Sequence, residues 1–280
     1  MKRRGKRERK SVGSWLVHVI LLAGAILAVA PFVWMLSTSL KSLEESFRNV
    51  GLIPEHFVWS NYPTVLFDLQ FLRYFANTAF VSVVATAGGV LASCMSGYAF
   101  ARLRWPGRDM WFGVYLTSMM VPGQVTLVPL YILVRSLGWI DTFYALIVPS
   151  LFGGSFGAFL VRQYLLSVPR EYDEAAIVDG ANWFNVFWLV VIPLAKPAIL
   201  TLSTLQFISE WNSYMWPLIV TSSERVRVLG LALAFMSGMH GTNWPYLMTG
   251  SVIACVPVFI LFFFLQRYLV EGLVMSGLKA

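Results

Sequence analysis

Six stretches of the chain are long and apolar enough to cross a membrane. Each approaches or exceeds the ~20 residues that span ~30 Å of hydrocarbon. None shows the alternating pattern of a membrane barrel strand, and helices are the other structure that satisfies the backbone in lipid. The pattern therefore predicts an all-α, polytopic membrane protein with six transmembrane helices. The predicted spans are about Trp15–Leu36, Tyr74–Phe100, Met110–Val134, Thr142–Val161, Val190–Val220 and Pro245–Leu265.

Composition agrees with this prediction and narrows the chemistry. Hydrophobic residues make up 58% of the 280 positions and charged residues 12%, about half of the ~25% charged residues of a soluble domain. An ordinary cytosolic enzyme, a disordered chain and a disulfide-rich scaffold are excluded. Cys94 and Cys255 each lie within an apolar run, and His18, His56 and His240 are scattered. We therefore expect no disulfide framework, no metal site and no cofactor.

The basic residues predict the orientation of the chain. The net charge is +7, but the Lys and Arg residues flank apolar stretches, which points to anionic lipid and not to nucleic acid. With the N-terminus in the cytoplasm, the inside segments hold Lys2, Arg3, Arg4, Lys6, Arg7, Arg9, Lys10, Arg102, Arg104, Arg108, Arg162, Arg170, Lys196, Arg267 and Lys279. The outside loops then hold Lys41, Arg48, Arg73, Arg135, Arg225 and Arg227. This bias predicts a basic cytoplasmic segment 1–14, a membrane domain 15–280 and two cytoplasmic termini.

Two further features concern packing. The longest outside loop, 37–73, carries Trp59, Tyr62, Pro54 and Pro63 and is expected to form a small ordered cap. The second span carries small residues at four-residue spacing, which lets helix backbones approach closely in lipid. They are Ala85, Gly89, Ser93 and Gly97. We expect a tight helix contact there, within the subunit or with a partner; a general excess of small residues in a span is the alternative.

A catalytic interpretation rests on one motif. Residues 153–157 match the G-x-S-x-G elbow of serine hydrolases, and Asp179 and His240 follow Ser155 in the order of that triad. The elbow needs a preceding strand, however, and Ser155 lies in an apolar helix. The predicted topology also separates Asp179 and His240 by ~30 Å of hydrocarbon. An intramembrane serine hydrolase is therefore the disfavoured alternative, and no catalytic residue is expected.

The long inside loop, about 162–192, is the most informative segment. Pro169 suits the first turn of a helix, and acidic residues after it complement the helix dipole. Gly180 is a good stop, and Asn182 can cap the next helix. The loop therefore predicts a helix from Pro169 to Asp179, ~16 Å long. Such an element suits docking into a groove of another protein, and a solvated connector is the alternative.

The same loop carries a family resemblance. It reads Glu174-Ala175-Ala176, then Gly180 three residues later, then Ile192-Pro193. This resembles the EAA loop of binding-protein-dependent ABC importer permeases, although Val190 and Ile192 stand where Ile and Leu are usual. The extended loop resembles the carbohydrate-importer branch, the maltose-permease type. Matching stretches are Val121–Gln124, Val128–Tyr131, Trp211-Asn212, Trp216–Leu218, Gln266–Tyr268 and Glu271–Leu273.

The resemblance implies a type I importer permease that binds no nucleotide itself, in keeping with the absence of a phosphate-binding loop from the sequence. Its implied partners are a second permease, which the maltose type supplies as a different chain, two ATPase subunits and an extracytoplasmic sugar-binding protein. Its implied location is the inner membrane of a prokaryote. The implied ATPase contacts in the loop are Glu171, Glu174, Ala175, Ala176, Asp179 and Gly180. Further contacts are expected in the tail at Glu271, Gly272 and Lys279, where a frayed end is the alternative.

The fifth span carries a candidate solute path. Polar residues fall within a sector ~100° wide, and such a face must contact protein or a water-filled cavity. They are Ser203, Gln206, Glu210, Ser213 and Tyr214. Gln206 and Ser213 can hydrogen-bond sugar hydroxyls, and Tyr214 can stack on a sugar ring. Packing on a polar partner helix is the alternative. A self-sufficient secondary transporter is a third possibility, but only Glu210 offers the intramembrane ionisable group that such proteins need.

Overall fold

The computed structural model describes residues 11–238 and 242–277, and every regular element in these ranges is a helix. The chain divides into two compact units. The first comprises residues 1–69 and 236–253, and the second comprises residues 70–235 and 254–280. The first unit contains α1 (Ser11–Ser39), α2 (Leu43–Arg48), α3 (Asn61–Pro63), the π-helical turn Thr64–Asp68 and the first part of α15 (Trp244–Gly277). The all-α prediction is confirmed for the described residues.

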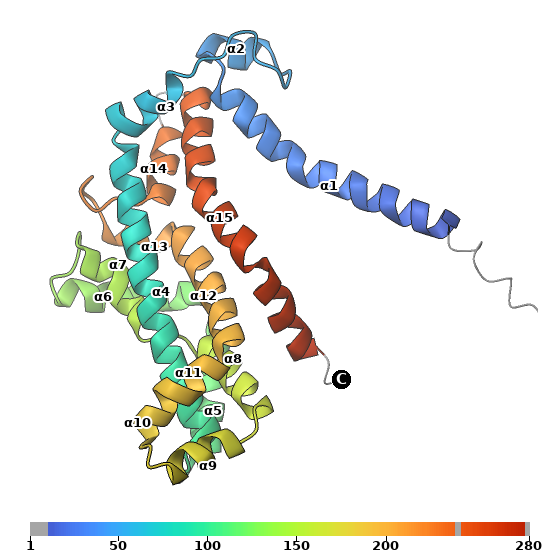
Figure 1. Ribbon diagram of the computed structural model, residues 1–280. Helices are drawn as coiled ribbons and strands as arrows, with labels where there is room; N and C mark the ends of the chain where they lie inside the picture. Colours follow the sequence, from blue (N-terminus) through green and yellow to red (C-terminus); the bar gives the residue numbers. More distant parts are fainter. Residues whose placement is uncertain (1–10, 239–241, 278–280) are drawn as a thin grey trace, which may run out of the picture. The chain divides into compact units, whose positions relative to one another are not determined.

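The second unit contains most of the elements, coloured cyan to orange in Figure 1, together with the red second part of α15. They are α4 (Phe71–Arg102), α5 (Arg108–Thr117), the 3-10 turn Ser118–Met120, α6 (Gly123–Ser136), α7 (Phe143–Leu151), α8 (Ser155–Ser167), α9 (Glu171–Val178), α10 (Trp183–Val186), the π-helical turn Phe187–Val191, α11 (Ile192–Leu194), α12 (Lys196–Trp211), α13 (Met215–Val220), α14 (Leu229–Met236) and the remainder of α15. Its most extensive helix contacts join α4 to α8, α12 and α7. Three short helices, α9 to α11, cluster at the end of α4 that carries Arg102 (Figure 1).

The small residues of α4 form its contact surface with these neighbours. A Cβ atom on Gly97 would lie 2.7 Å from Val161 and 3.0 Å from the carbonyl oxygen of Ala158 in α8. A Cβ atom on Gly89 would lie 2.6 Å from the carbonyl oxygen of Ser150 in α7. The predicted tight helix contact is therefore confirmed, and it lies within the subunit.

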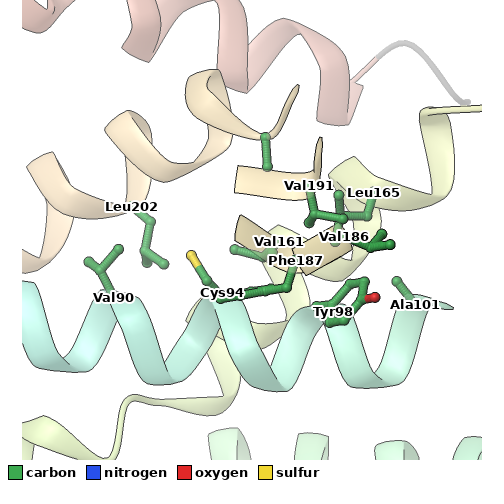
Figure 2. Close-up of a cluster of buried hydrophobic side chains, with 11 residues drawn as sticks. Val90, Cys94, Tyr98, Ala101, Val161, Leu165, Val186, Phe187, Val191 and Leu202 are labelled. Carbon is green, nitrogen blue, oxygen red and sulfur yellow. The ribbon is translucent and has the colours of Figure 1, made fainter. Parts of the chain in front are cut away.

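One apolar core lies beside the end of α4 that carries Arg102. Figure 2 shows Cys94, Tyr98 and Ala101 of α4 directed towards side chains from α8 and from the turn that follows α10. The Tyr98 hydroxyl donates to the carbonyl oxygen of Trp183 at 3.3 Å. The cluster comprises Val90, Cys94, Tyr98, Ala101, Val161, Leu165, Val186, Phe187, Val191, Ala195 and Leu202. Burial of these side chains fixes the loop helices against α4.

The predicted spans differ from the observed helices at two places. Four helical segments are long and apolar enough to cross a membrane by themselves, and the number is up to six if each of two bent pairs forms one span. The predicted third span bends by 98° between Met120 and Gly123, where Pro122 precedes α6. The prediction of one continuous helix for the fifth span, Val190–Val220, was wrong. The segments Trp183–Leu194 and Lys196–Trp211 meet at 78°, and α13 is a separate helix. Pro197 in the first turn of α12 fits a helix start at this bend.

The first unit contains the predicted ordered cap. Lys41 is 1% exposed, and its ammonium group donates to the carbonyl oxygens of Asn49 at 2.8 Å and Gly51 at 2.6 Å. The side-chain amide of Asn61 donates to the carbonyl oxygens of Ser39 and Lys41. These bonds satisfy backbone carbonyl groups of the loop that have no partner in a regular helix. The loop after α1 therefore has a defined structure.

Candidate functional site

The helix α9 exposes both acidic and apolar side chains to its surroundings. Glu171, Tyr172, Glu174 and Val178 are exposed, whereas Asp173 is buried. Tyr172 and Val178 are large apolar residues with 54% and 87% of their surface accessible. A short helix with exposed apolar and acidic side chains, fixed to its own protein by its opposite side, is well suited to bind a groove lined by apolar and basic groups.

Local sequence explains where α9 begins and ends. The helix runs from Glu171 to Val178, ~12 Å, and is shorter than the predicted Pro169–Asp179. Its first turn starts later because the carbonyl oxygen of Arg170 accepts the amides of Asp173 and Glu174, which makes Arg170 the N-cap. Three acidic residues in this turn, Glu171, Asp173 and Glu174, complement the helix dipole.

The stop after α9 follows the prediction closely. Gly180 has a φ of +89°, a left-handed conformation that L side chains rarely adopt. The Ala181 amide donates to the Ala176 carbonyl oxygen at 2.9 Å, which closes the helix end. Asn182 then caps α10, because its side-chain oxygen accepts the Asn185 amide at 2.8 Å. Gly180 and Asp179 are exposed in this turn, and Ala175 is exposed while Ala176 is half-buried.

Sequence reasoning missed the contact that holds α9. Asp173 Oδ2 lies 2.9 Å from the Nε atom of Arg102, the last residue of α4, and the two side chains are 7% and 3% exposed. Burial raises the pKa of the Asp173 carboxyl above its ordinary value, and the Arg102 and Arg170 guanidinium groups oppose this rise. The available signal was spacing: Asp173 lies three residues before the inward-facing Ala176, so it shares the inner face of α9.

The polar residues of the fifth span divide into three groups. Gln206 and Glu210 of α12 line a cavity of about 330 Å³, together with Ser93, Ser150 and Ser209. Ser213 lies with Glu210 at a second cavity of about 20 Å³. Neither cavity lining includes Ser203 or Tyr214; Ser203 is half-buried and Tyr214 is exposed. The structure therefore brings together only the central members of the predicted stripe.

The larger cavity has a mostly apolar lining, into which three helices place single polar groups. The Ser150 hydroxyl of α7 donates to the Glu210 carboxylate. The Gln206 side-chain amide donates to the carbonyl oxygen of Ala85 in α4 at 3.4 Å. Ser93 has a buried hydroxyl without a hydrogen-bond partner among the described residues. A cavity with hydroxyl, amide and carboxylate groups can exchange hydrogen bonds with a polyhydroxylated molecule.

The structure gives no support to the serine hydrolase interpretation. Ser155 starts α8, and its hydroxyl bonds to that of Ser118 at 2.8 Å. Asp179 lies in the turn beyond the other end of this 13-residue helix, which is ~20 Å long. His240 lies outside the described residues. Gly153 and Gly157 pack against Ser93 of α4, so the motif serves close helix packing. No three His, Cys, Asp or Glu residues converge within the part of the chain that the structure describes.

The predicted tail contacts fall at the edge of the described chain. Glu271 and Gly272 lie in the last turns of α15, a stretch in which only the helical backbone is described. Lys279 lies outside the described residues.

Comparison with known proteins gives one consistent result. The model of a family described as "Binding-protein-dependent transport system inner membrane component" matches residues 85–274. The chain is 32% identical over 278 residues to the arabinooligosaccharides transport system permease protein AraQ of Halalkalibacterium halodurans, covering 98% of this chain and 99% of the relative. It is 28% identical over 268 residues to the probable starch degradation products transport system permease protein AmyC of Thermoanaerobacterium thermosulfurigenes, covering 96% and 98%.

A solved structure has the same fold. A chain from the crystal structure of a bacterial ABC transporter involved in the import of the acidic polysaccharide alginate matches with a TM-score of 0.84 and 25% sequence identity. The match covers 95% of this chain and 99% of that chain. The similarity therefore extends over both units of the structure and over both candidate regions.

Proposed function

The chain belongs to the family of binding-protein-dependent transport system inner membrane components, and from this we propose that it is a transmembrane permease subunit of an ATP-driven carbohydrate importer. It is a multi-pass membrane protein and a transport subunit, and it catalyses no reaction itself. The observation that carries the proposal is the match along nearly the whole chain to a permease for arabinooligosaccharides.

The proposed partners follow from what the chain has and lacks. The sequence contains no phosphate-binding loop, so the nucleotide is bound by two ATPase subunits. The long, apolar α1, whose described side chains are almost all exposed, provides surface for lipid and for a second permease of different sequence. An extracytoplasmic binding protein delivers the solute, in keeping with the description of the family.

We place both termini and the loop 162–192 in the cytoplasm, with a basic segment 1–14 before the membrane domain 15–280. The asymmetric distribution of Lys and Arg supports this orientation. Single cysteines at the exposed positions Ser60 and Asn185 test it in a chain whose Cys94 and Cys255 are replaced. An impermeant thiol reagent added to sealed cells should label position 60 and leave position 185 unlabelled. The reverse result would contradict the orientation.

In this orientation α9 is the coupling helix that contacts the ATPase. Its exposed acidic residues, Glu171 and Glu174, can pair with basic groups of the partner, and its small residues allow close approach. The proposed contacts are Glu171, Glu174, Ala175, Ala176, Asp179 and Gly180, and those of the tail are Glu271, Gly272 and Lys279. Ala176 contributes least directly, because it packs against the core beside α4.

The cavity beside α12 is the proposed solute path. Glu210 and Gln206 supply an acceptor and a donor, and hydroxyl groups from α4, α7 and α12 surround them. Carbohydrate hydroxyls both donate and accept hydrogen bonds, so these polar groups can bind them.

Reconstitution tests the function as a whole. The chain, its partner permease, the ATPase and the binding protein are incorporated into proteoliposomes, and ATP hydrolysis is measured with arabinooligosaccharides, starch-derived oligosaccharides or alginate oligosaccharides. We expect one carbohydrate class to stimulate hydrolysis several-fold over methionine as the control solute. Solute uptake by the purified chain without an ATPase would contradict the proposal and favour a secondary transporter.

A further inference from the structure

We propose that Arg102, Arg170 and Asp173 are positioning residues that join the coupling helix rigidly to α4, so that a displacement of α9 is passed to the membrane helix. This inference rests on the proposed function and assigns a role to residues that do not face the ATPase. We call this arrangement the α9–α4 joint, and it consists of the three residues and the carbonyl groups that they bind.

The joint is reciprocal, because each side donates to the other. From α4, the Arg102 guanidinium contacts Asp173 in the first turn of α9 and donates to the carbonyl oxygen of Val168 at 2.9 Å. From the segment before α9, Arg170 donates to the carbonyl oxygen of Ala101 at 3.1 Å. Ala101 is in the last turn of α4, where carbonyl groups have no partner within the helix. Two bonds in opposite directions fix both the separation and the rotation of the two helix ends.

A planar guanidinium is suited to this task. Its donors have a fixed geometry, so one Arg102 side chain can hold a carboxylate and a carbonyl group at set positions at the same time. Arg162 adds a third cation at the same helix end, since its Nε atom donates to the carbonyl oxygen of Phe100 at 3.3 Å. Cations at a helix C-terminus also complement its dipole.

Stability alone is a poor explanation for the buried pair. Removing two charges from water is costly, and well-packed apolar residues often serve a fold equally well or better. In addition, Arg102 Nε and Asp173 Oδ1 are buried and have no hydrogen-bond partner among the described residues, so the two groups are held by charge and not by an aligned hydrogen bond. An ion pair, unlike an apolar pair, has a preferred geometry. It therefore defines how α9 is oriented on the end of α4.

Beyond the joint, α4 leads to the proposed solute path. Eight residues before Ala101, α4 contributes Ser93 to the wall of the 330 Å³ cavity, and its Ala85 carbonyl group accepts the Gln206 amide of α12. The close packing at Gly89 and Gly97 leaves α4 little room to yield between these points. Movement of α9 at the Arg102 end of α4 is therefore expected to reach the cavity beside the middle of this helix.

A double-mutant cycle tests the joint in the reconstituted complex. The variants are Arg102→Gln, Asp173→Asn and the combination of both, and the matched control is Arg104→Gln, an exposed arginine two residues further along. Two quantities are measured: co-purification with the ATPase, and the number of solute molecules transported per ATP hydrolysed. We expect each single variant to assemble and to lower transport per ATP about tenfold, and the double variant to be no worse than either. The control should behave as wild type.

A second pair separates positioning from packing. Arg102→Met combined with Asp173→Leu keeps the site filled and uncharged, so we expect normal assembly with transport per ATP still lowered about tenfold. Normal transport per ATP in this pair or in the single variants would overturn the joint. Failure of the apolar pair to assemble would also overturn it, because a contact that only sets direction is not needed for assembly. A wild-type complex without solute-stimulated hydrolysis would instead contradict the proposed function.

Discussion

The end of the second unit at α9 and the polar face of α12 use polar side chains in opposite ways. At α9, charged groups are buried and held in defined contacts, since Arg102 forms an ion pair with Asp173 and donates to the carbonyl oxygen of Val168. Along α12, Gln206 donates to Ala85 and Glu210 accepts from Ser150, and both side chains line a cavity. The first region is built to keep one geometry, and the second keeps polar groups available to a ligand. Substitutions should therefore affect coupling in the first region and solute preference in the second.

The largest effect is expected at the turn that ends α9. Gly180→Pro fixes φ near −65° where the native value is +89°, and it removes the amide that donates to the Ile177 carbonyl oxygen. We expect transport to fall by more than tenfold while the chain still reaches the membrane. Glu174→Lys should act similarly by reversing the charge of the exposed face. Uptake assays and membrane immunoblots measure both quantities.

Gly180→Ala is the matched control for that turn. No atom lies within 4 Å of an added Cβ at this position, so only the backbone conformation is penalised, by about 1 kcal/mol. We expect a small loss of transport. Normal uptake by Gly180→Pro and Glu174→Lys would exclude α9 as the coupling element.

The next effect concerns the packing that connects the two regions. Gly97→Ala introduces a Cβ 2.7 Å from Val161 and 3.0 Å from a backbone oxygen of α8, and overpacking of this kind costs about 1–3 kcal/mol. We expect a lower thermal unfolding temperature in detergent. Gly113→Ala, with nothing within 4 Å of the new atom, should leave it unchanged. Equal stability of the two variants would show that the α4–α8 contact is looser than described.

A moderate and different effect is expected on the cavity side. Glu210→Gln removes the charge that faces the cavity, and Gln206→Ala removes the amide that bonds to Ala85. We expect the apparent affinity for solute to change about three- to tenfold, by the loss of one hydrogen bond to a charged or polar group. Assembly and basal ATP hydrolysis should be retained. If only assembly is impaired, these residues are structural and the solute passes elsewhere.

The smallest effect is expected on the stability of the fold at low pH. It involves the Asp141 carboxylate, which accepts hydrogen bonds from two backbone amides. Burial alone would raise the pKa of Asp141, but the amides of Ser222 and Ser223, both at 2.9 Å, lower it below its ordinary 3.8. The unfolded chain then binds protons more readily, so this stabilisation is present above pH 3.8 and is lost as the pH falls below it. Asp141→Asn should weaken this dependence and still tolerate the positive φ of 59°. Unfolding curves at pH 3 and pH 6 compare the two proteins.

Local signals in the sequence predicted the local features well. The four-residue spacing of small residues in α4 predicted a close helix contact, and Gly180 and Asn182 predicted a helix stop and a cap. Each of these features depends on a residue type and its neighbours in the chain. The six apolar stretches were found for the same reason, since span length is a property of consecutive residues.

Features that depend on distant residues could not be predicted. Arg102 and Asp173 are 71 positions apart, and nothing in either local sequence indicates the other. Hydropathy reports the composition of a segment and not its direction, so the bends of 98° and 78° in two predicted spans were missed. For the same reason Tyr214 was predicted on one stripe with Glu210, although α12 ends at Trp211 and Tyr214 lies beyond it. Ser203 stays in α12 but lines neither cavity.

The seam of small residues along α4 also sets how freely this chain can be redesigned. At Gly89, Gly97 and Gly153 an added methyl group would meet backbone or packed side-chain atoms within 3 Å, so these positions accept almost no variation. Leu205 and Ser209, by contrast, line the cavity from exposed positions on α12. A library intended to change the carbohydrate preference should therefore randomise the residues of α12 that line the cavity and leave α4 unchanged. Only the α12 side of the cavity has positions at which new side chains can be accommodated.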